Sequence, residues 1–328
     1  MKRLTSVIIP CFNSARWLKE AIDSCLAQSY QEIEVIVIDD GSTDDSLDII
    51  RGYDSRIIWE SGPNRGGNHA RNRGFALSKG EYIQYLDSDD YLMPEKIERQ
   101  IEFLEKEEAD VIYGDWQYLY HLKNGETVFG DIEDSRTGED FLEMLLEDKK
   151  WIAPGAFLFT RAIVEKSGGW DESLKAGQDR DFLISVALAN AKFTYQPGCY
   201  SVYRRYGKET VSTSNQRVWV ENHFQLMKKA EEKLLEKNGF SVNYRRALAQ
   251  SYFSKATSWC LYLNHTDYLS TLKKVQSLHD EFNPASSSIY GFLQRFFGFF
   301  ITGIIFRFMK RVRYFWKLKP YEPLHINK

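Results

Sequence analysis

The sequence has only four cysteines, and none lies in a motif that would hold a metal or a disulfide framework. The 328 residues contain no CxxC pair, and no cysteine is grouped with the six histidines as zinc ligands are. Small secreted domains need disulfides to supplement their cores, but a chain of this length does not. We therefore exclude a sequence-evident zinc site and expect apolar, buried roles for Cys11, Cys25, Cys199 and Cys260.

An excess of charge of one sign is also absent. There are 43 Lys and Arg residues against 46 Asp and Glu residues, so the formal net charge is −3. This balance argues against a general nucleic-acid binder. The chain is 43% hydrophobic and 27% charged, which excludes wholesale disorder. No secretory signal precedes the first strand-like run, so we expect the body of the protein in the cytoplasm.

The first third of the chain alternates between strand and helix patterns. Short apolar, β-branched runs lie at residues 6–9, 34–38, 57–59 and 82–86, with helical patterns between them. Repeated β-α-β units predict an α/β fold with a doubly wound, mostly parallel sheet. Ligands of such sheets bind beyond the carboxyl ends of the strands.

Mixed and then purely helical patterns follow. Residues 109–212 combine strands and helices, with a hairpin turn at 123–126. After Ser214 we predict only helices, at 217–237, 244–263 and 267–278. The expected organisation is an α/β catalytic-type domain, a helical appendage and a distinct tail, at residues 1–213, 214–285 and 286–328.

The tail has no acidic residue between Glu281 and Glu322, although seven Lys and Arg residues and many aromatic residues lie there. Its uncharged run at 296–306 is shorter than the roughly 20 apolar residues that span a bilayer. An aromatic, basic helix is typical of an in-plane membrane anchor. Burial on the domain is the alternative, but burial alone does not explain the absence of acids. We expect peripheral contact with the inner face of the cell membrane.

Two polar clusters follow the second and third strand runs. The acidic turn at 39–44 has more carboxylates than helix capping needs, and a carboxylate there can accept hydrogen bonds from a nucleoside. The segment 64–74 has two adjacent glycines at a helix start, where backbone can approach a phosphate. Arg71 is the best candidate for a diphosphate contact, although a helix cap with solvated arginines is the simpler interpretation of this segment alone.

A third cluster, Asp87-Ser88-Asp89-Asp90, follows the fourth strand run directly. Three carboxylates in four residues repel one another unless a cation lies among them, and hard oxygen ligands suit Mn²⁺ or Mg²⁺. A solvated turn is the alternative, but the preceding buried strand favours a metal site. A fourth pair of acids, Asp179 and Asp181, opens a helix, where capping is the alternative to a general base.

In order and spacing, these clusters resemble the family 2 glycosyltransferases of the GT-A fold over about residues 4–212. The matching pieces are the run 7–13, the acidic turn 39–44, the segment 68–74, the DxD of Asp87 and Asp89, the stretch 168–172 and Asp179. The resemblance implies an inverting transfer of a sugar from a nucleotide-diphosphate sugar, of UDP type, to a hydroxyl of a glycan, glycolipid or lipid-linked acceptor.

The resemblance also implies roles for individual residues. Pro10, Phe12 and Asp40 would line the base, Asp87 would approach the ribose or the metal, and Asp89 would bind Mn²⁺ or Mg²⁺. Asp179 would act as the general base toward the acceptor hydroxyl. The full predicted donor site comprises Pro10, Phe12, Asn13, Asp40, Asn68, Arg71, Asp87 and Ser88.

Two positions depart from the family pattern. Gln178 stands where an acidic neighbour of the base is usual, and the missing charge should ease ionisation of Asp179. Tyr206 stands where a His is often found, which puts a third protein ligand for the metal in doubt, while Arg204 or Arg205 remains a candidate for phosphate. The small and polar residues at 207–214 are typical of a lid.

Three other functions compete with this hypothesis. A nucleotidyltransferase would be expected to have a Gly-rich, basic loop after the first strand, which residues 11–15 lack. A non-catalytic nucleotide-sugar-binding protein would not need to keep the acids Asp87, Asp89 and Asp179. A dinucleotide oxidoreductase is disfavoured because no GxGxxG follows the first strand.

Overall fold

The structure, a computed structural model, describes residues 3–138, 140–206, 216–237, 239–260, 263–282 and 288–317. By internal contacts the chain divides into two compact units, Met1–Leu226 and Met227–Lys328. The expected lid at 207–214 lies outside the described residues, as does the end of the tail from residue 318 onward.

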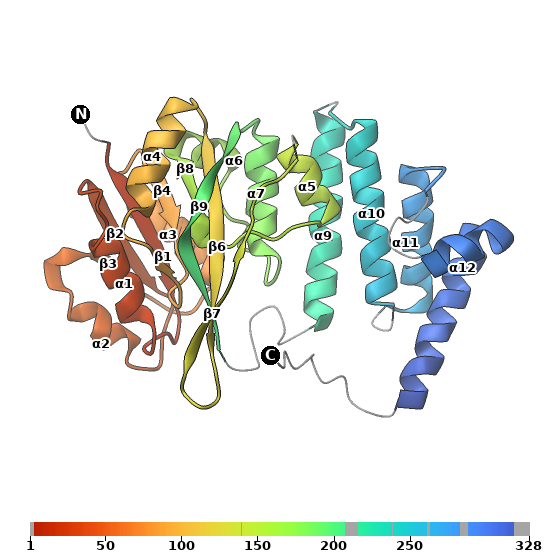
Figure 1. Ribbon diagram of the computed structural model, residues 1–328, viewed down its shortest axis with the longest axis horizontal. Coiled ribbons are helices and arrows are strands. Elements are labelled where there is room, and N and C mark those ends of the chain that lie inside the picture. The colour runs from red at the N-terminus through yellow and green to blue at the C-terminus, as the bar shows by residue number, and fades with distance from the viewer. Residues whose placement is uncertain are drawn as a thin grey trace. The chain divides into compact units, whose positions relative to one another are not determined.

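The first unit is built on one mixed sheet (Figure 1). Its strands are β1 (Thr5–Cys11), β2 (Ile33–Asp39), β3 (Ile58–Ser61), β4 (Tyr82–Tyr85), β5 (Tyr91–Leu92), β6 (Val111–His121), β7 (Thr127–Glu133), β8 (Phe157–Thr160) and β9 (Phe193–Arg205). The order is β3-β2-β1-β4-β8-β6-β9-β5, with β7 paired to β6. The first four strands pair in parallel, whereas β8 is antiparallel to both of its neighbours. This is the predicted α/β, doubly wound mixed sheet.

Helices of the first unit connect these strands. They are α1 (Leu18–Leu26), α2 (Ser46–Arg51), α3 (Gly67–Leu77), α4 (Lys96–Lys106), α5 (Phe141–Glu147), α6 (Arg161–Ser167) and α7 (Gln178–Leu188), and α9 (Gln216–Glu236) runs into the second unit. Helix α4 was not predicted, although its apolar residues Ile97, Ile101 and Leu104 recur at helical spacing. Its buried face also includes the polar side chains of Lys96 and Gln100.

Two local features differ from or refine the sequence predictions. Residues 193–205 form one strand instead of two, with register shifts opposite Gly114 and Asp115 of β6. On α3, Gly74 allows the helix to approach β1, because a Cβ there would lie 2.4 Å from Cγ2 of Ile8. This close contact holds α3, and with it Arg71 one turn earlier, against the sheet.

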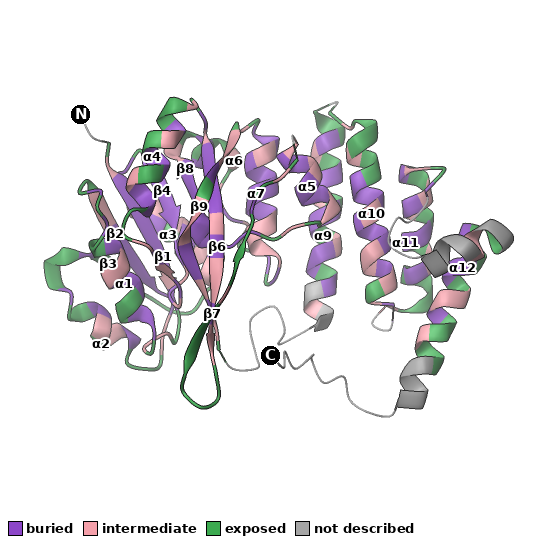
Figure 2. Ribbon diagram, viewed as in Figure 1, coloured by how far each residue is buried: buried purple, intermediate pink, exposed green. Residues whose placement is uncertain are grey.

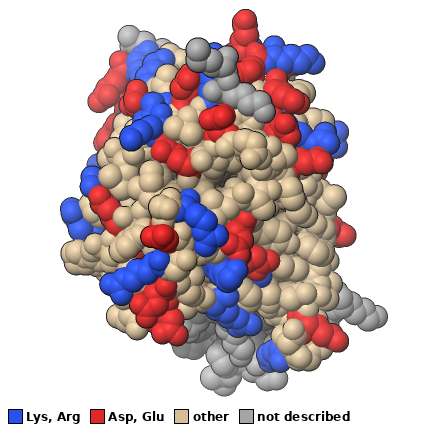
Figure 3. All heavy atoms as spheres, turned by 90° about the vertical axis from the view of Figure 1, so that its left-hand side faces the viewer, with Lys and Arg blue, Asp and Glu red and all other residues tan. Residues whose placement is uncertain are grey.

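Burial follows the sheet (Figure 2). Most residues of β1 and β2 are buried, as the continuous apolar runs predict for strands covered on both faces. On the face shown in Figure 3, acidic and basic side chains are interspersed, in keeping with the balanced charge of the sequence.

The second unit is helical, as predicted, and contains α10 (Val242–Ser258), α11 (His265–Leu278) and α12 (Ser288–Lys317). These three helices pack on one another. Helix α12 is interrupted at Gly298, whose φ of 72° is not helical. Within the described ranges, no helix has both the length and the apolar character needed to cross a bilayer.

Candidate active site

Three strand ends meet at one edge of the sheet. Strand β1 lies between β2 and β4 and is parallel to both, so that Cys11 is in register with Asp39 where β1 and β2 end. The segments that follow these strands contain Phe12, Asp40 and the acids of residues 87–90, and they leave the sheet at the same edge. The tertiary structure therefore gathers sequence clusters that lie far apart in the chain.

The loop after β1 is tied to the turn after β2. Asn13 has a φ of 49°, a left-handed conformation that Asn tolerates better than most residues. Its backbone N–H donates to Oγ of Ser42 over 2.9 Å, and its side-chain Oδ1 accepts from the N–H of Thr43 over 2.8 Å. Next to it, the Phe12 side chain is 49% exposed, whereas Pro10 is only partly exposed. This loop thus offers an exposed aromatic ring on a fixed backbone.

Asp40 organises the loop that precedes α3. Its two carboxylate oxygens accept hydrogen bonds from the backbone N–H groups of Arg65 and Gly66, each over 2.8 Å. Gly66 has a φ of 97°, which favours glycine. The buried Asp40 carboxylate therefore positions the start of α3 as well as lying at the predicted nucleotide site.

Arg71 lies beneath this loop, on the first turns of α3. Its Nη2 donates to Oδ1 of Asp87 over 2.7 Å, and its guanidinium lies 4.5 Å from the ring centroid of Trp170. Asn68, buried beside it, donates to the backbone oxygen of Asp171 over 2.6 Å. Arg71 is also close enough to Asp179 for the two charges to interact. The structure thus brings together Arg71, Asp87 and Asp179 from α3, the end of β4 and α7.

The acidic cluster after β4 is supported from several elements. Ser88 is buried, and its Oγ lies 2.6 Å from Oγ of Ser14. Oδ2 of Asp89 accepts from the hydroxyl of Tyr206 over 2.9 Å. Burial and the neighbouring charge of Asp87 raise the pKa of Asp89. Tyr206, at the position where the family often has a His, therefore contacts the predicted metal ligand.

Arg204 holds this cluster in place. Its backbone N–H donates to Oδ1 of Asp90 over 2.8 Å, and its Nε donates to the backbone oxygen of Asp89 over 2.7 Å. The guanidinium also pairs with Glu20 over 2.6 Å and lies 4.2 Å from the ring centroid of Trp17. Because these contacts engage the guanidinium, Arg204 is better suited to support the acidic turn than to bind phosphate.

Asp179 is the second residue of α7, after the N-cap Gly177 and Gln178, and so lies in the first turn as predicted. Burial raises the pKa of Asp179 to about 6, with Arg71 opposing that shift and Asp87 reinforcing it. The side chain of Trp151 lies near this carboxylate and, like Arg71, opposes the rise in its pKa. Asp181, two residues further along the same helix, is only 3% exposed. A pKa near neutrality suits a general base.

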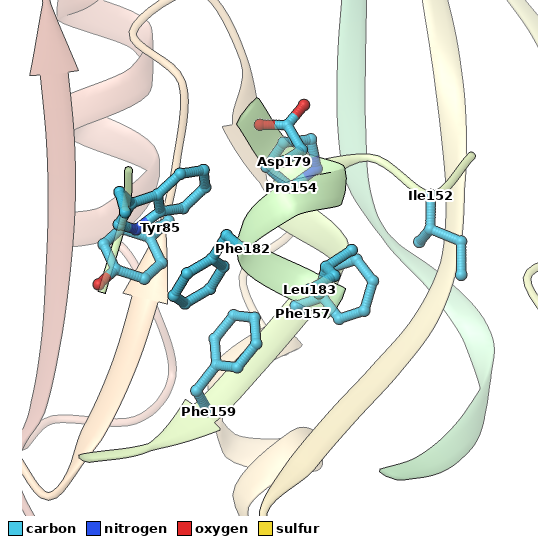
Figure 4. A pocket seen from close by; sticks show the side chains of 9 residues that line it. Tyr85, Ile152, Pro154, Phe157, Phe159, Asp179, Phe182 and Leu183 are labelled. Atoms are coloured by element: carbon cyan, nitrogen blue, oxygen red, sulfur yellow. The ribbon is translucent and has the colours of Figure 1, made fainter. Parts of the chain in front are cut away.

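An apolar pocket lies beside Asp179 (Figure 4). It has about 250 Å³ of empty space, including the part that opens to solvent, and Asp179 is its one acidic lining residue. Tyr85, Phe159, Phe182 and Leu183 lie below the carboxylate of Asp179, which points away from them in the figure. This apolar surrounding is the physical origin of the raised pKa.

The acids after β4 are suited to a divalent cation. The carboxylates of Asp87 and Asp89 are near enough for one charge to raise the pKa of the other, and a cation would relieve that repulsion. Across the described ranges, no group of three or more His, Cys, Asp or Glu side chains is arranged to hold a metal. Asp87 and Asp89 would offer two carboxylates to a Mn²⁺ or Mg²⁺ shell that water and substrate phosphate complete.

The sequence analysis did not assign a role to Trp151, which the structure places against the predicted base. Aromatic side chains are more often core residues, so sequence alone had no signal for this contact. Tyr206 was noted only for its departure from the family pattern, and its hydroxyl contact with Asp89 depends on the end of β9 reaching the acidic turn.

Comparison with known sequences agrees with this geometry. Residues 6–168 match the model of the family described as glycosyl transferase family 2. An uncharacterized glycosyltransferase of Rickettsia typhi is 38% identical over 181 residues, which are 54% of this chain and 57% of the relative. Glycosyltransferase GlyG of Streptococcus pneumoniae is 37% identical over 145 residues, 43% of this chain and 46% of the relative. The chain spans about half the length of these curated relatives.

Solved structures share the fold. S. aureus TarS 1-349 in complex with UDP-GlcNAc aligns with a TM-score of 0.65 at 21% identity, covering 84% of this chain and 80% of that chain. The same protein in complex with UDP has a TM-score of 0.64 at 19% identity, covering 99% and 95%. These likenesses confirm the GT-A type of α/β fold, and the family match confirms the resemblance inferred from the motifs. Residues 6–168 belong to glycosyl transferase family 2.

Proposed function

We propose that this family 2 domain is an inverting glycosyltransferase, which moves a sugar from a UDP-type nucleotide sugar to an acceptor hydroxyl. The observation that carries the proposal is the meeting of Arg71, Asp87 and Asp179 at the carboxyl edge of the parallel strands. Departure of a diphosphate and attack by a hydroxyl require three kinds of group, which are a cation-binding acid, a guanidinium and a base of raised pKa.

The donor would lie along the strand ends. Phe12 is an exposed ring beside Pro10 and faces solvent, as a base-stacking residue must, while Asn13 and Asp40 fix the surrounding loops. Arg71 carries its charge to the position proposed for the diphosphate, and it donates to Oδ1 of Asn68 as well as to Asp87. Ser88 follows Asp87 in the chain, and its hydroxyl lies within hydrogen-bond distance of Ser14. The UDP-GlcNAc bound by TarS motivates the choice of a UDP-type donor.

Asp87 and Asp89 would hold Mn²⁺ or Mg²⁺ with the donor phosphates. When bound, such an ion supplies Lewis-acid stabilisation of charge on the departing diphosphate. Tyr206 donates to Asp89 and leaves that carboxylate's other oxygen for a cation.

Asp179 would carry the chemical step. Its carboxylate takes the proton of the acceptor hydroxyl while that oxygen forms a bond to the anomeric carbon. The bond from the anomeric carbon to the diphosphate breaks, and the nucleoside diphosphate leaves with the electron pair. Attack on the face opposite to the leaving group inverts the configuration at that carbon.

The test is a panel of nucleotide sugars, first by thermal shift with Mn²⁺ or Mg²⁺ and then by release of nucleoside diphosphate in the presence of glycan, glycolipid and lipid-linked acceptors. Stabilisation by a UDP-sugar, with UDP release that depends on an acceptor, is the expected result. Release of pyrophosphate would instead indicate a nucleotidyltransferase. Binding without turnover of any donor would indicate a nucleotide-sugar-binding protein.

We also propose that α12 contacts the inner face of the cell membrane. Ile301, Ile304, Phe308, Met309 and Val312, all after the break at Gly298, are between 37% and 67% exposed and recur at helical spacing. The opposite side of the helix is buried, with Thr302 fully covered and Arg307 donating to the backbone oxygens of Leu263 and Asn264. An apolar stripe in an acid-free, basic segment is suited to a bilayer with anionic headgroups.

A further inference from the structure

Aromatic side chains cover one face of β6 and β9. We define the aromatic platform as Trp116, Tyr118, Tyr120, Trp151 and Tyr203. The three residues on β6 alternate along the strand and so share a face of the sheet, and Tyr203 of β9 is in register with Tyr118. Trp151 comes from the segment that precedes the short 3-10 helix η2 (Pro154–Ala156).

The platform is a packed surface and not a set of isolated rings. Trp151 meets Trp116 edge-on with centroids 4.9 Å apart and meets Tyr203 with centroids 5.0 Å apart. Gly130 of β7 leaves room for the ring of Tyr120, since a Cβ at this position would lie 3.0 Å from Cε2 of Tyr120. Trp116 is buried, yet Trp151 is 39% exposed. An aromatic ring that is held by its neighbours and still reaches solvent loses little entropy when it binds a ligand.

The platform adjoins both the predicted base and the acidic cluster after β4. Ile152 and Pro154, from the segment that begins with Trp151, line the same pocket as Asp179. Tyr203 directly precedes Arg204, whose backbone N–H donates to Oδ1 of Asp90 over 2.8 Å. The exposed ring of Trp151 therefore lies where an acceptor whose hydroxyl meets Asp179 would place the rest of its structure.

We propose that the aromatic platform is the acceptor subsite and that Trp151 stacks against a pyranose ring. One face of a pyranose presents C–H groups, which pack on an aromatic ring, whereas an acyclic polyol has no such face. The pocket that Ile152 and Pro154 share with Asp179 brings this recognition next to the base. This inference rests on the proposed function, because it assigns the acceptor of the same site.

The experiment measures acceptor binding apart from turnover. Saturation-transfer NMR on the full chain with UDP and Mg²⁺ uses methyl pyranosides of glucose, galactose and N-acetylglucosamine as probes, with ribitol as the acyclic control. We expect signal transfer to at least one pyranoside and a preference for it over ribitol. Trp151→Leu keeps apolar bulk without an aromatic face and should weaken that binding about tenfold, while UDP affinity stays unchanged.

Two further variants separate the roles of Trp151. Trp151→Phe keeps a ring but loses the indole N–H near Asp179, so we expect the acceptor KM to stay within about threefold while kcat falls. Phe129→Ala is the matched control, because Phe129 is a 50% exposed aromatic residue of the same sheet and is in register with Leu119, on the other face from the platform. Phe129→Ala should change neither the acceptor KM nor kcat.

The outcomes are separable. Unchanged pyranoside binding in Trp151→Leu would overturn the platform even if the enzyme is active. Weaker UDP-sugar binding in that variant would make the platform part of the donor site. Pyranoside binding that depends on Trp151, without turnover of any donor, would keep the platform and refute the proposed transferase activity instead.

Discussion

The strand ends of the first unit and helix α12 of the second carry their candidate functional side chains in opposite ways. At the strand ends each charged group has its own partner, as Asp87 has Arg71 and Asp89 has Tyr206. On α12 the large exposed apolar residues from Ile301 to Val312 matter through their common side of the helix. A site of paired charges depends on each member, whereas a stripe of apolar side chains contributes roughly in proportion to its area.

This difference orders the expected effects of substitution. Removing one charged partner leaves the other buried without compensation, so single changes at the strand ends should be severe. Removing one apolar side chain from α12 forfeits only the transfer free energy of that side chain. The four predictions below run from the largest expected effect to the smallest.

Asp179→Asn should lower kcat by about 10²–10⁴-fold and leave donor affinity nearly intact, because the amide cannot accept the acceptor's proton. Steady-state kinetics together with UDP-sugar binding measure both quantities. Asp181→Asn is the control on the same helix and should keep its turnover. If Asp181→Asn is inactive and Asp179→Asn turns over normally, the base has been assigned to the wrong carboxylate.

Asp89→Asn should weaken UDP-sugar binding by at least about tenfold in Mn²⁺ or Mg²⁺, since it removes a charged oxygen ligand. Titration calorimetry with and without the ion measures the effect, and the loss should shrink when the ion is left out. Glu133→Gln, an exposed acid on β7, is the control. Wild-type activity that persists undiminished in excess EDTA would refute the metal role.

Acid should inactivate transfer through Asp179, whose pKa is raised to about 6. The ionised form accepts the proton, so kcat should be flat above this pKa and fall about tenfold per pH unit well below it. A pH profile of kcat at saturating donor tests the sign and the position of the break. A rate that rises on acidification, or that breaks only near the ordinary Asp pKa, would contradict the burial of this carboxyl group.

Ile304→Ser and Phe308→Ser should each reduce binding to anionic liposomes by about two- to tenfold, and together roughly multiplicatively. Co-sedimentation with vesicles of phosphatidylglycerol and phosphatidylcholine measures the partition. Val242→Ser is the control, because Val242 is 75% exposed on α10 and lies outside the stripe. High salt should release the protein only in part. A wild-type chain that stays in the supernatant at low salt would refute the membrane contact.

Much of the fold was predictable because its signals are local. The strand β2 is apolar along consecutive positions, and the turn after it contains the acids and glycine that such a turn needs. The helix α7 and the place of Asp179 at its start were likewise readable from a glycine followed by acids. The helix α4 was not predicted, although Ile97, Ile101 and Leu104 recur at helical spacing on its buried face.

The contacts within the site could not be predicted in the same way. Arg204 and Asp90 are separated by 114 positions, and no local pattern in either segment indicates that they pair. Asp40 resembles a ligand-binding acid in the sequence, but its oxygens also hold the backbone of residues 65 and 66. Which groups a carboxylate meets depends on the packing of several elements, and the sequence motif does not encode that packing.

The sequence by itself determined the alternation of strands and helices in the first third of the chain, the acidic turns at the strand ends, and the apolar and basic character of the tail. Each follows from periodicity or turn chemistry within a few residues. Only the tertiary structure decided that Ile152 and Pro154 share a pocket with Asp179 and that α12 buries one side while exposing the other. Such contacts form between segments distant in the chain, so they exist only once the sheet and the helices have packed.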